Sequence, residues 1–330
     1  MAEIYPWQKT LWQQLAGRRQ HAHAYLLHGP AGIGKRQLAE SLAHLLLCQQ
    51  PQGLAACGHC KSCLLLAAGT HPDLFELKPS EDRKSVGVDD VRELIEFVCK
   101  TAQLGGRKLV LLAEPPAEEM TLAASNALLK SLEEPSRDTV LLLLSHQPSR
   151  LLPTIKSRCV QQACPVPGQA DSLAWLAQQL PEQEEAQRQA LLELAQGSPL
   201  SALRLAGEGV LEQRAAVVEG MKRLFKRQAS PSQLAEAWSA IDLLLLLGWF
   251  FDWSQAMLRY QLTADEASLG AQDMRKVNQY LAQKTPRSRL LPLQDTLLQQ
   301  RQKVLSKANL NRTLLLETLL AQWASLPGPG

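Results

Sequence analysis

AYLLHGPAGIGK, residues 24–35, is the stretch of sequence that decides the fold. It opens with a short apolar run, Ala24–His28, that predicts a strand, and it leads into RQLAESLAHLLLC, where leucines recur at helical spacing. A glycine-rich loop between a strand and a helix is the setting of a phosphate-binding loop, because glycines let backbone N–H groups curl around phosphate at a helix N-terminus. An ordinary glycine turn is the alternative. The residues expected to surround a phosphate are Gly29, Gly32, Gly34 and Lys35.

The residues that would hold magnesium beside this loop depart from what hydrolysis needs. Arg36 stands where a Ser or Thr hydroxyl should bind the ion, and a guanidinium has no lone pair to offer a cation. An acidic group should also follow a buried strand. The apolar run Lys108–Ala113 is followed by Glu114, which either substitutes for that group or is a solvated loop carboxylate. The sequence therefore permits phosphate binding but opposes hydrolysis by this chain alone.

Further apolar runs extend the strand–helix alternation along the first half of the chain. Residues 73–77, 108–113 and 139–144 predict strands, and VDDVRELIEFV predicts a helix with Asp89 or Asp90 as its N-cap. Apolar runs without alternation are typical of parallel strands that are buried on both faces. We therefore expect an α/β fold with a parallel sheet covered by helices on both sides.

The pattern changes near Pro165 and Pro167, beyond which Leu, Ala and Gln dominate and no strand is predicted. Glycines and prolines near residues 197–199 and 207–209 divide this helical part. The fold class is thus α/β plus all-α. We expect a P-loop-type α/β domain over residues 1–164, a small helical domain over 165–207 and a helical domain over 208–330.

Composition narrows the class of protein without naming a partner. The formal net charge of +3 is too small to imply a nucleic-acid partner by itself. The N-terminus has no signal-peptide pattern, and the longest apolar stretch, Leu243–Phe251, is far short of the about 20 residues that cross a bilayer. We expect that stretch to be a buried helix. Seven cysteines without a secretory signal favour a reducing compartment, so we expect a cytoplasmic protein with no membrane partner.

Four cysteines have metal-ligand spacing: Cys48, Cys57, Cys60 and Cys63. Thiolates two residues apart can turn onto one ion, and four sulfurs match a closed, structural zinc site. An iron–sulfur cluster is the chemical alternative, although the ferredoxin pattern places its fourth cysteine differently; free thiols are the other. The remaining cysteines lie in apolar or strand-like segments and are expected to be buried thiols: Cys99, Cys159 and Cys164.

Together these motifs resemble the delta-prime subunits of bacterial DNA polymerase III clamp loaders, which belong to the AAA+ superfamily. The resemblance covers nearly the whole chain and is densest from Ala22 to Cys159. It rests on HAYLLHGPAGIGK, CQQPQG…CGHCKSC, GTHPDL, GVDDVREL, LGGRKLVLL, NALLKSLEEP, IKSRC and AQGSPLSAL. The zinc insert combined with Ser157-Arg158-Cys159 is its most specific part.

The resemblance implies an AAA+ module, in which residues 165–207 form a lid, joined to a C-terminal helical collar. It implies a hetero-pentameric ring with delta and gamma/tau subunits, which loads the sliding clamp on primer-template DNA. Arg158 would be an arginine finger reaching a neighbour's ATP, whereas from the residues alone a lone arginine is more simply a surface ion pair. The position of the family's sensor arginine holds Leu200. The chain would then be a polymerase holoenzyme subunit without catalysis of its own.

Two other functions remain open. An autonomous or weakly active ATPase would bind ATP through Lys35 and use Glu114, with ATP binding expected to be weak or absent. A zinc-dependent nucleic-acid binder is the other, and the near-neutral charge weighs against it.

Overall fold

In this computed structural model the described residues are 4–80, 83, 85–104, 106–136, 138–270, 272–305 and 310–327. The chain divides into two compact units, Met1–Glu208 and Gly209–Gly330. Among the described residues, no helix is both long and apolar enough to cross a membrane.

The first unit is built on a parallel, five-stranded sheet in the order β2-β3-β4-β1-β5. Its strands are β1 (Ala24–His28), β2 (Leu74–Glu76), β3 (Lys108–Leu112), β4 (Thr139–Ser145) and β5 (Val160–Ala163). The first four confirm the predicted strands within a residue or two at each end. Strand β5 was missed, because VQQA is polar and mostly exposed and is held by its pairing with β1 rather than by burial.

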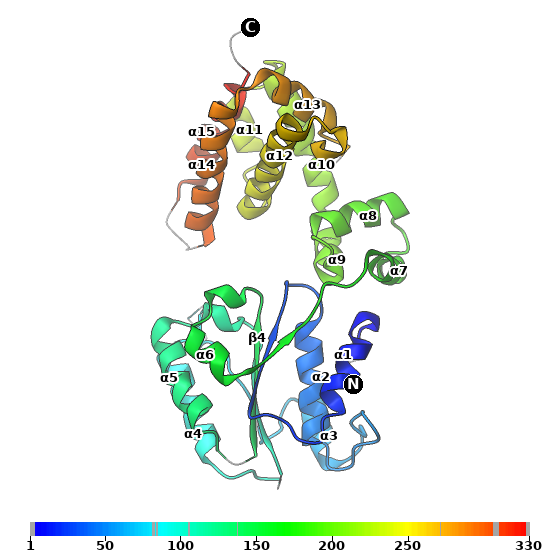
Figure 1. The fold of residues 1–330 in the computed structure, drawn as a ribbon, viewed down its shortest axis with the longest axis vertical. Helices are drawn as coiled ribbons and strands as arrows, with labels where there is room; N and C mark the ends of the chain where they lie inside the picture. Colours follow the sequence, from blue (N-terminus) through cyan, green and yellow to red (C-terminus); the bar gives the residue numbers. More distant parts are fainter. Residues whose placement is uncertain are drawn as a thin grey trace. The chain divides into compact units, whose positions relative to one another are not determined.

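Helices cover both faces of this sheet, as predicted. Alternate side chains of β1 enter opposite cores: Leu26 packs toward α4, α5 and α6, and Leu27 packs toward α1 and α2. Figure 1 shows these two groups of helices on opposite sides of the sheet. The elements of this part are η1 (Pro6–Gln8), α1 (Lys9–Ala16), α2 (Lys35–Leu47), α3 (Lys61–Ala67), α4 (Val88–Cys99), η2 (Ala117–Glu119), α5 (Leu122–Glu133), η3 (Pro148–Arg150) and α6 (Pro153–Arg158).

Two local expectations about α4 were wrong. The helix is capped by Gly87, and Asp90 lies inside its first turn, where its carboxylate accepts the Gly87 N–H at 2.7 Å and the Ser80 hydroxyl at 2.5 Å. At the other end, Cys99 is exposed rather than buried, because it follows Val98, the last buried residue of the helix. Cys159 and Cys164 are buried as expected.

Three helices complete the first unit: α7 (Gln169–Gln179), α8 (Glu185–Leu194) and α9 (Pro199–Gly207). They pack on one another. Near the start of α9, the Leu200 N–H donates to the Gly32 carbonyl at 3.0 Å. This hydrogen bond joins the helical part of the unit to the glycine loop.

The second unit is helical in all its described elements. These are α10 (Val210–Phe225), α11 (Pro231–Ala237), α12 (Leu243–Thr263), η4 (Glu266–Leu269), α13 (Arg275–Lys284), α14 (Arg287–Leu305) and α15 (Arg312–Ala324). The stretch Leu243–Phe251 begins α12, whose side chains Trp249 and Phe250 are almost fully buried, so the predicted buried helix is confirmed. Arg214 pairs with Asp273 at 2.6 Å inside this unit.

Candidate functional site

The glycine loop has the backbone conformation that its sequence requires. Gly29, Gly32 and Gly34 have φ angles of 147°, 74° and 87°, in the region that side-chain-bearing residues rarely adopt. Gly34 is the left-handed N-cap of α2, which begins at Lys35. A Cβ at Gly29 would lie 2.3 Å from the Cys164 carbonyl oxygen. The strand, the loop and the helix N-terminus are therefore arranged as in a phosphate-binding loop.

The chain's own residues pack closely around this loop. The Ile33 carbonyl accepts hydrogen bonds from Trp7 Nε1 at 3.0 Å and from Gln8 Nε2 at 2.9 Å. A Cβ at Gly34 would lie 2.4 Å from the Tyr5 ring, and one at Gly32 would lie 2.0 Å from the Ser201 hydroxyl. The N-terminal segment and α9 thus cover the loop from two sides.

Lys35 hydrogen-bonds to its own loop. Its Nζ donates to the carbonyl oxygens of Gly29 at 2.6 Å and Pro30 at 2.5 Å, and the residue is only 3% exposed. Burial lowers the pKa of Lys35 from 10.5 to about 8, although Cys164 and Glu118 nearby act in the other direction. A phosphate arriving here would compete with these two carbonyls for the ammonium group.

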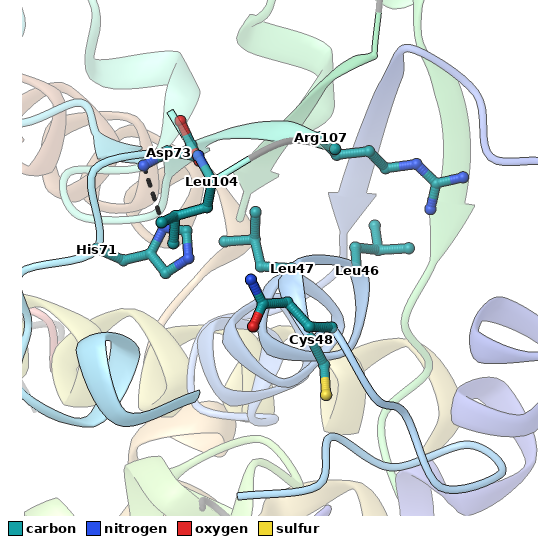
Figure 2. A pocket seen from close by; sticks show the side chains of 9 residues that line it. Leu46, Leu47, Cys48, His71, Asp73, Leu104 and Arg107 are labelled. Atoms are coloured by element: carbon teal, nitrogen blue, oxygen red, sulfur yellow. Dashed lines mark hydrogen bonds between the residues drawn. The ribbon is translucent and has the colours of Figure 1, made fainter. Parts of the chain in front are cut away.

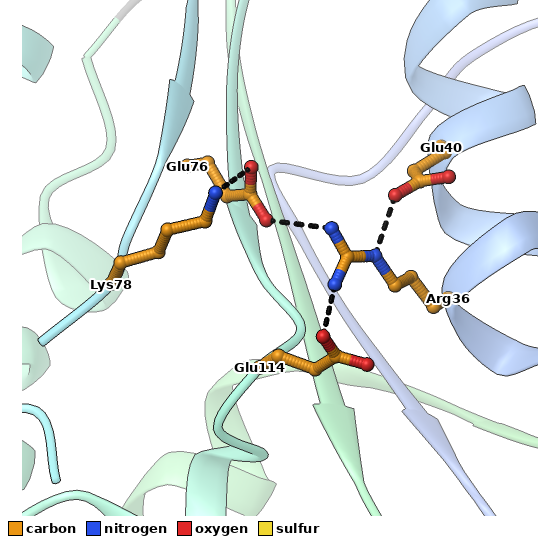
Figure 3. Close-up of polar contacts among 5 residues, drawn as sticks. All are labelled: Arg36, Glu40, Glu76, Lys78 and Glu114. Atoms are coloured by element: carbon orange, nitrogen blue, oxygen red, sulfur yellow. Dashed lines mark hydrogen bonds and ion pairs between the residues drawn. The ribbon is translucent and has the colours of Figure 1, made fainter. Parts of the chain in front are cut away.

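The guanidinium of Arg36 contacts three carboxylates from three parts of the fold (Figure 3). Its Nε lies 2.7 Å from Glu40, one turn on in α2, and its Nη2 lies 3.1 Å from Glu76 of β2. Its Nη1 contacts Glu114, which follows β3. Lys78 pairs with Glu76 from the other side at 2.8 Å. Glu114 is therefore a largely solvated carboxylate, with its side chain 66% exposed, that pairs with Arg36.

Two side chains near Lys35 were missed by the sequence analysis. Glu118 accepts the backbone N–H groups of His146 at 2.8 Å and Gln147 at 3.0 Å. Burial lowers the pKa of His146, and the positive charge of Lys35 lowers it further. His146 directly follows β4, and the carboxyl ends of parallel strands are where such folds place functional groups, which is the signal that could have found it.

The four cysteines converge into a metal-ligand cluster, as their spacing predicts. Their sulfurs all lie within 4.8 Å of one another, with 4.0 Å between Cys48 and Cys60 and 3.9 Å between Cys57 and Cys63. A tetrahedron with Zn–S bonds of about 2.3 Å has S–S edges of about 3.8 Å. The cluster could therefore bind a metal ion and is compatible with structural zinc.

Backbone donors support thiolate character in this cluster. The N–H groups of Cys57, Cys60 and Cys63 point at the sulfurs of Cys48, Cys57 and Cys60 at 3.3–3.4 Å. Burial opposes ionisation of Cys60, but hydrogen bonds to its sulfur outweigh burial and lower its pKa to about 6. The pKa of Cys63 is raised, chiefly by burial. Four thiolates this close together repel one another, so a bound cation would favour their joint ionisation.

A buried histidine connects this cluster to the end of α2. His71 Nδ1 accepts the Asp73 N–H at 3.0 Å, so Nε2 carries the proton and faces the Ser62 hydroxyl at 2.8 Å. Ser62 in turn donates to the Leu47 carbonyl at 2.7 Å. Beside these groups lies a cavity of about 250 Å³ (Figure 2), from which the Cys48 sulfur points away. It is lined by Leu46, Leu47, Cys48, Gln49, His71, Asp73, Leu104, Gly106 and Arg107.

Arg158 is the last residue of α6 and forms the ion pair expected of a surface arginine. Its Nη2 lies 2.6 Å from Glu133, at the end of α5. Its Nη1 donates to the Thr154 carbonyl at 3.0 Å and to the Ser157 hydroxyl at 3.3 Å. The side chain remains 33% exposed. Neither the glycine loop nor the cysteine cluster contributes to these contacts.

A parallel sheet, a glycine loop capping α2 and a following helical segment define a P-loop-type α/β module. The chain belongs to the family of DNA polymerase III delta' subunits. The family model described as "DNA polymerase III, delta subunit" matches residues 6–165, and the one described as "DNA polymerase III, delta subunit, C terminal" matches residues 208–325.

Two curated relatives match nearly their whole length. DNA polymerase III subunit delta' of Pseudomonas aeruginosa is 66% identical over 330 residues, covering 100% of both chains. Its counterpart from Yersinia pestis is 38% identical over 335 residues, covering 99% of this chain and 97% of the relative. Among solved structures, a DNA polymerase III gamma subunit-related protein from Thermotoga maritima aligns with a TM-score of 0.44 and 22% identity, covering 97% of this chain and 99% of that one.

Proposed function

We propose that this chain is a non-hydrolysing delta' subunit of the DNA polymerase III clamp-loader complex. It would scaffold a hetero-pentameric ring with delta and gamma/tau subunits and supply Arg158 to a neighbour's ATP. The ring would then load the sliding clamp on primed DNA during replication. The observation that carries the proposal is the pairing of Arg36 with Glu40, Glu76 and Glu114 beside the glycine loop.

The Arg36 cluster supports the absence of hydrolysis through simple charge chemistry. Phosphoryl transfer needs a metal ion that bridges the terminal phosphates and an acidic group that helps to hold it. Here the acidic group, Glu114, is committed to a guanidinium that cannot coordinate phosphate and carboxylate oxygens as a metal does. Lys35 also donates to carbonyls of its own loop. Hydrolysis would require both arrangements to be undone.

Arg158 is suited to act on a nucleotide held by another subunit. It ends a short helix and is partly exposed, so a neighbour's phosphate could approach it. A guanidinium supplied across an interface stabilises charge that develops on the γ-phosphate, an effect worth about 10³–10⁵ in rate. The family membership supports the role, and the exposure of the side chain is compatible with it.

We further propose that the metal held by Cys48, Cys57, Cys60 and Cys63 is zinc with a structural role. Four sulfur ligands leave no open position for chemistry, and metal binding would contribute folding free energy to the segment that connects α2 to α3. Metal analysis should find one zinc per chain, and a chelator should lower Tm. Cys63→Ser should lower both the zinc content and Tm, whereas Cys99→Ser, at an exposed position away from the cluster, should change neither. Iron with visible absorption would favour a cluster instead.

Three domains remain our proposed division of the chain: residues 1–164 as the AAA+ P-loop domain, 165–207 as the lid and 208–330 as the collar. The α7–α9 helices pack on one another, which supports treating them as a separate lid within the first unit. The helical second unit would take part in assembly of the ring.

A second candidate function is a weak nucleotide-binding or ATPase activity. It is favoured by the three glycines with positive φ and by the retained Lys35, which keep the phosphate-binding geometry of the loop. Lys35→Ala would abolish such an activity.

One assay separates the two candidates. The isolated chain should show no ATP turnover, and adding it to the gamma/tau and delta subunits with clamp and primed DNA should raise their ATP hydrolysis. Turnover by the isolated chain that is lost in Lys35→Ala would instead establish the second function. Nucleotide titration of the same sample would report binding without hydrolysis.

A further inference from the structure

The ion pair between Arg158 and Glu133 joins the ends of two packed helices. Glu133 is the last residue of α5, and Arg158 is the last residue of α6. The two helices pack against each other, and the 2.6 Å contact between Nη2 and Oε1 spans 25 residues of sequence. The pair is therefore a tertiary contact rather than a feature of one helix.

The placement of Glu133 is electrostatically unfavourable unless it is paired. The C-terminus of a helix carries partial negative charge, which disfavours a carboxylate and favours a guanidinium. Glu133 adds negative charge at the end of α5, and Arg158 brings the compensating charge from the end of α6. The local field therefore draws the Arg158 side chain toward Glu133.

Three contacts hold the guanidinium of Arg158 in the observed orientation. The Thr154 carbonyl and the Ser157 hydroxyl hold Nη1, and Glu133 holds Nη2. A free arginine would lose considerable rotamer freedom on reaching a phosphate across an interface, and a side chain that is already ordered loses less. A guanidinium has five N–H donors, so these three contacts leave donors for a second anion.

We propose that Glu133 is a positioning residue for Arg158: it orients the guanidinium for the phosphate of a neighbouring subunit's nucleotide. The inference rests on the proposed function of Arg158. Glu133 touches no nucleotide itself and acts through the arginine. Its loss should therefore lower the rate of the hydrolytic step more than the affinity of the neighbour for ATP.

The test is steady-state ATP hydrolysis by the reconstituted ring with clamp and primed DNA. Glu133→Ala should lower kcat by about 2- to 5-fold, the range expected for an exposed ion pair, with KM for ATP changed by less than about twofold. Glu133→Gln keeps an oxygen acceptor and should recover part of kcat. Glu134→Ala removes the neighbouring exposed carboxylate and should leave kcat unchanged. In the Arg158→Ala background, Glu133→Ala should have no further effect.

The outcomes separate the inference from the proposed function. If Arg158→Ala leaves hydrolysis unchanged, the finger assignment fails and the inference fails with it. If Arg158→Ala removes the stimulation while Glu133→Ala keeps or raises the wild-type kcat, Arg158 acts without help from Glu133 and the inference alone is overturned. Thermal unfolding and ring assembly are measured on each variant. Glu133→Ala could lose kcat because the ring no longer assembles. If Glu133→Gln then assembles well and keeps the wild-type kcat, positioning by the charge of Glu133 is also contradicted.

Discussion

Arg36 and Arg158 are the same side chain in two opposite settings. All three guanidinium nitrogens of Arg36 contact carboxylates, which come from α2, β2 and the segment after β3. Among the described residues, Arg158 pairs with one carboxylate and otherwise contacts neutral oxygens of Thr154 and Ser157 within α6. The charge of Arg36 is shared among three carboxylates of its own fold, whereas the charge of Arg158 faces a single carboxylate.

The difference shows how a P-loop module can keep its fold when its glycine loop is not used for hydrolysis and another residue acts on a neighbour's nucleotide. At the glycine loop, cations of the chain itself take up the groups that a metal and a nucleotide would need. At the end of α6, a cation pairs with one carboxylate rather than with three. We therefore expect substitutions at Arg158 to affect the activity of the complex, and substitutions around Arg36 to affect the stability of this chain.

The largest effect is expected from Arg158→Ala in the reconstituted ring. Stimulated ATP hydrolysis should fall by about 10³-fold if the guanidinium stabilises the transition state of a neighbour. Arg158→Lys keeps the charge but loses the planar fork, so it should recover only a small part of the rate. Arg204→Ala serves as the matched control. It removes an exposed arginine of α9 that pairs with Glu208, the C-cap residue of the same helix. If Arg158→Ala and Arg158→Lys support ATP hydrolysis at the rate of Arg204→Ala, Arg158 does not act on a neighbour's ATP. The functional contrast between Arg36 and Arg158 would then be lost.

The second largest effect is expected in how the free energy of unfolding depends on pH, through the ionisation of Lys35. Its pKa is lowered to about 8 in the folded chain, and an unfolded lysine titrates near 10.5. Between these values the unfolded state binds more protons, so the free energy of unfolding should rise with pH in that window. Relative to Lys35→Met, the wild type should gain about 2–3 kcal/mol from pH 7 to pH 10.5.

Urea unfolding of the two proteins at a series of pH values would measure this difference. A parallel dependence on pH would mean that Lys35 is solvated in the folded chain. Added nucleotide gives a further readout, because a bound phosphate would raise the pKa of Lys35 and flatten the rise.

The smallest effect is expected from Arg36→Met. Its loss leaves Glu40, Glu76 and Glu114 without their shared cation, which should destabilise the first unit by about 1 kcal/mol at pH 7 and low salt, since the group is partly solvated. The difference from wild type should shrink at high salt, because salt screens exposed charges. Urea unfolding would show it. A variant as stable as wild type at low salt would mean that the cluster contributes little.

Strands and helices could be predicted from the sequence wherever a short, local pattern of apolar residues and glycines determines them. The strand, loop and helix over residues 24–47 and the three other predicted strands follow from local apolar runs and glycines. Strand β5 could not be predicted, because its polar residues are ordered only by pairing with β1. We expected Asp89 or Asp90 to be the N-cap of α4, but the N-cap is Gly87. Asp90 lies inside the first turn, where its carboxylate accepts hydrogen bonds from the Gly87 N–H and the Ser80 hydroxyl.

By itself the sequence determined the glycine loop, the arginine in place of a magnesium ligand, and the four cysteines whose spacing brings their sulfurs together. These features depend on residues close in the chain, where spacing alone sets geometry. Only the tertiary structure decided that Arg36 pairs with Glu76 and Glu114, 40 and 78 residues away, and that Arg158 pairs with Glu133. Such pairs depend on how strands and helices are brought side by side, and long charged side chains can reach several partners until the fold selects one.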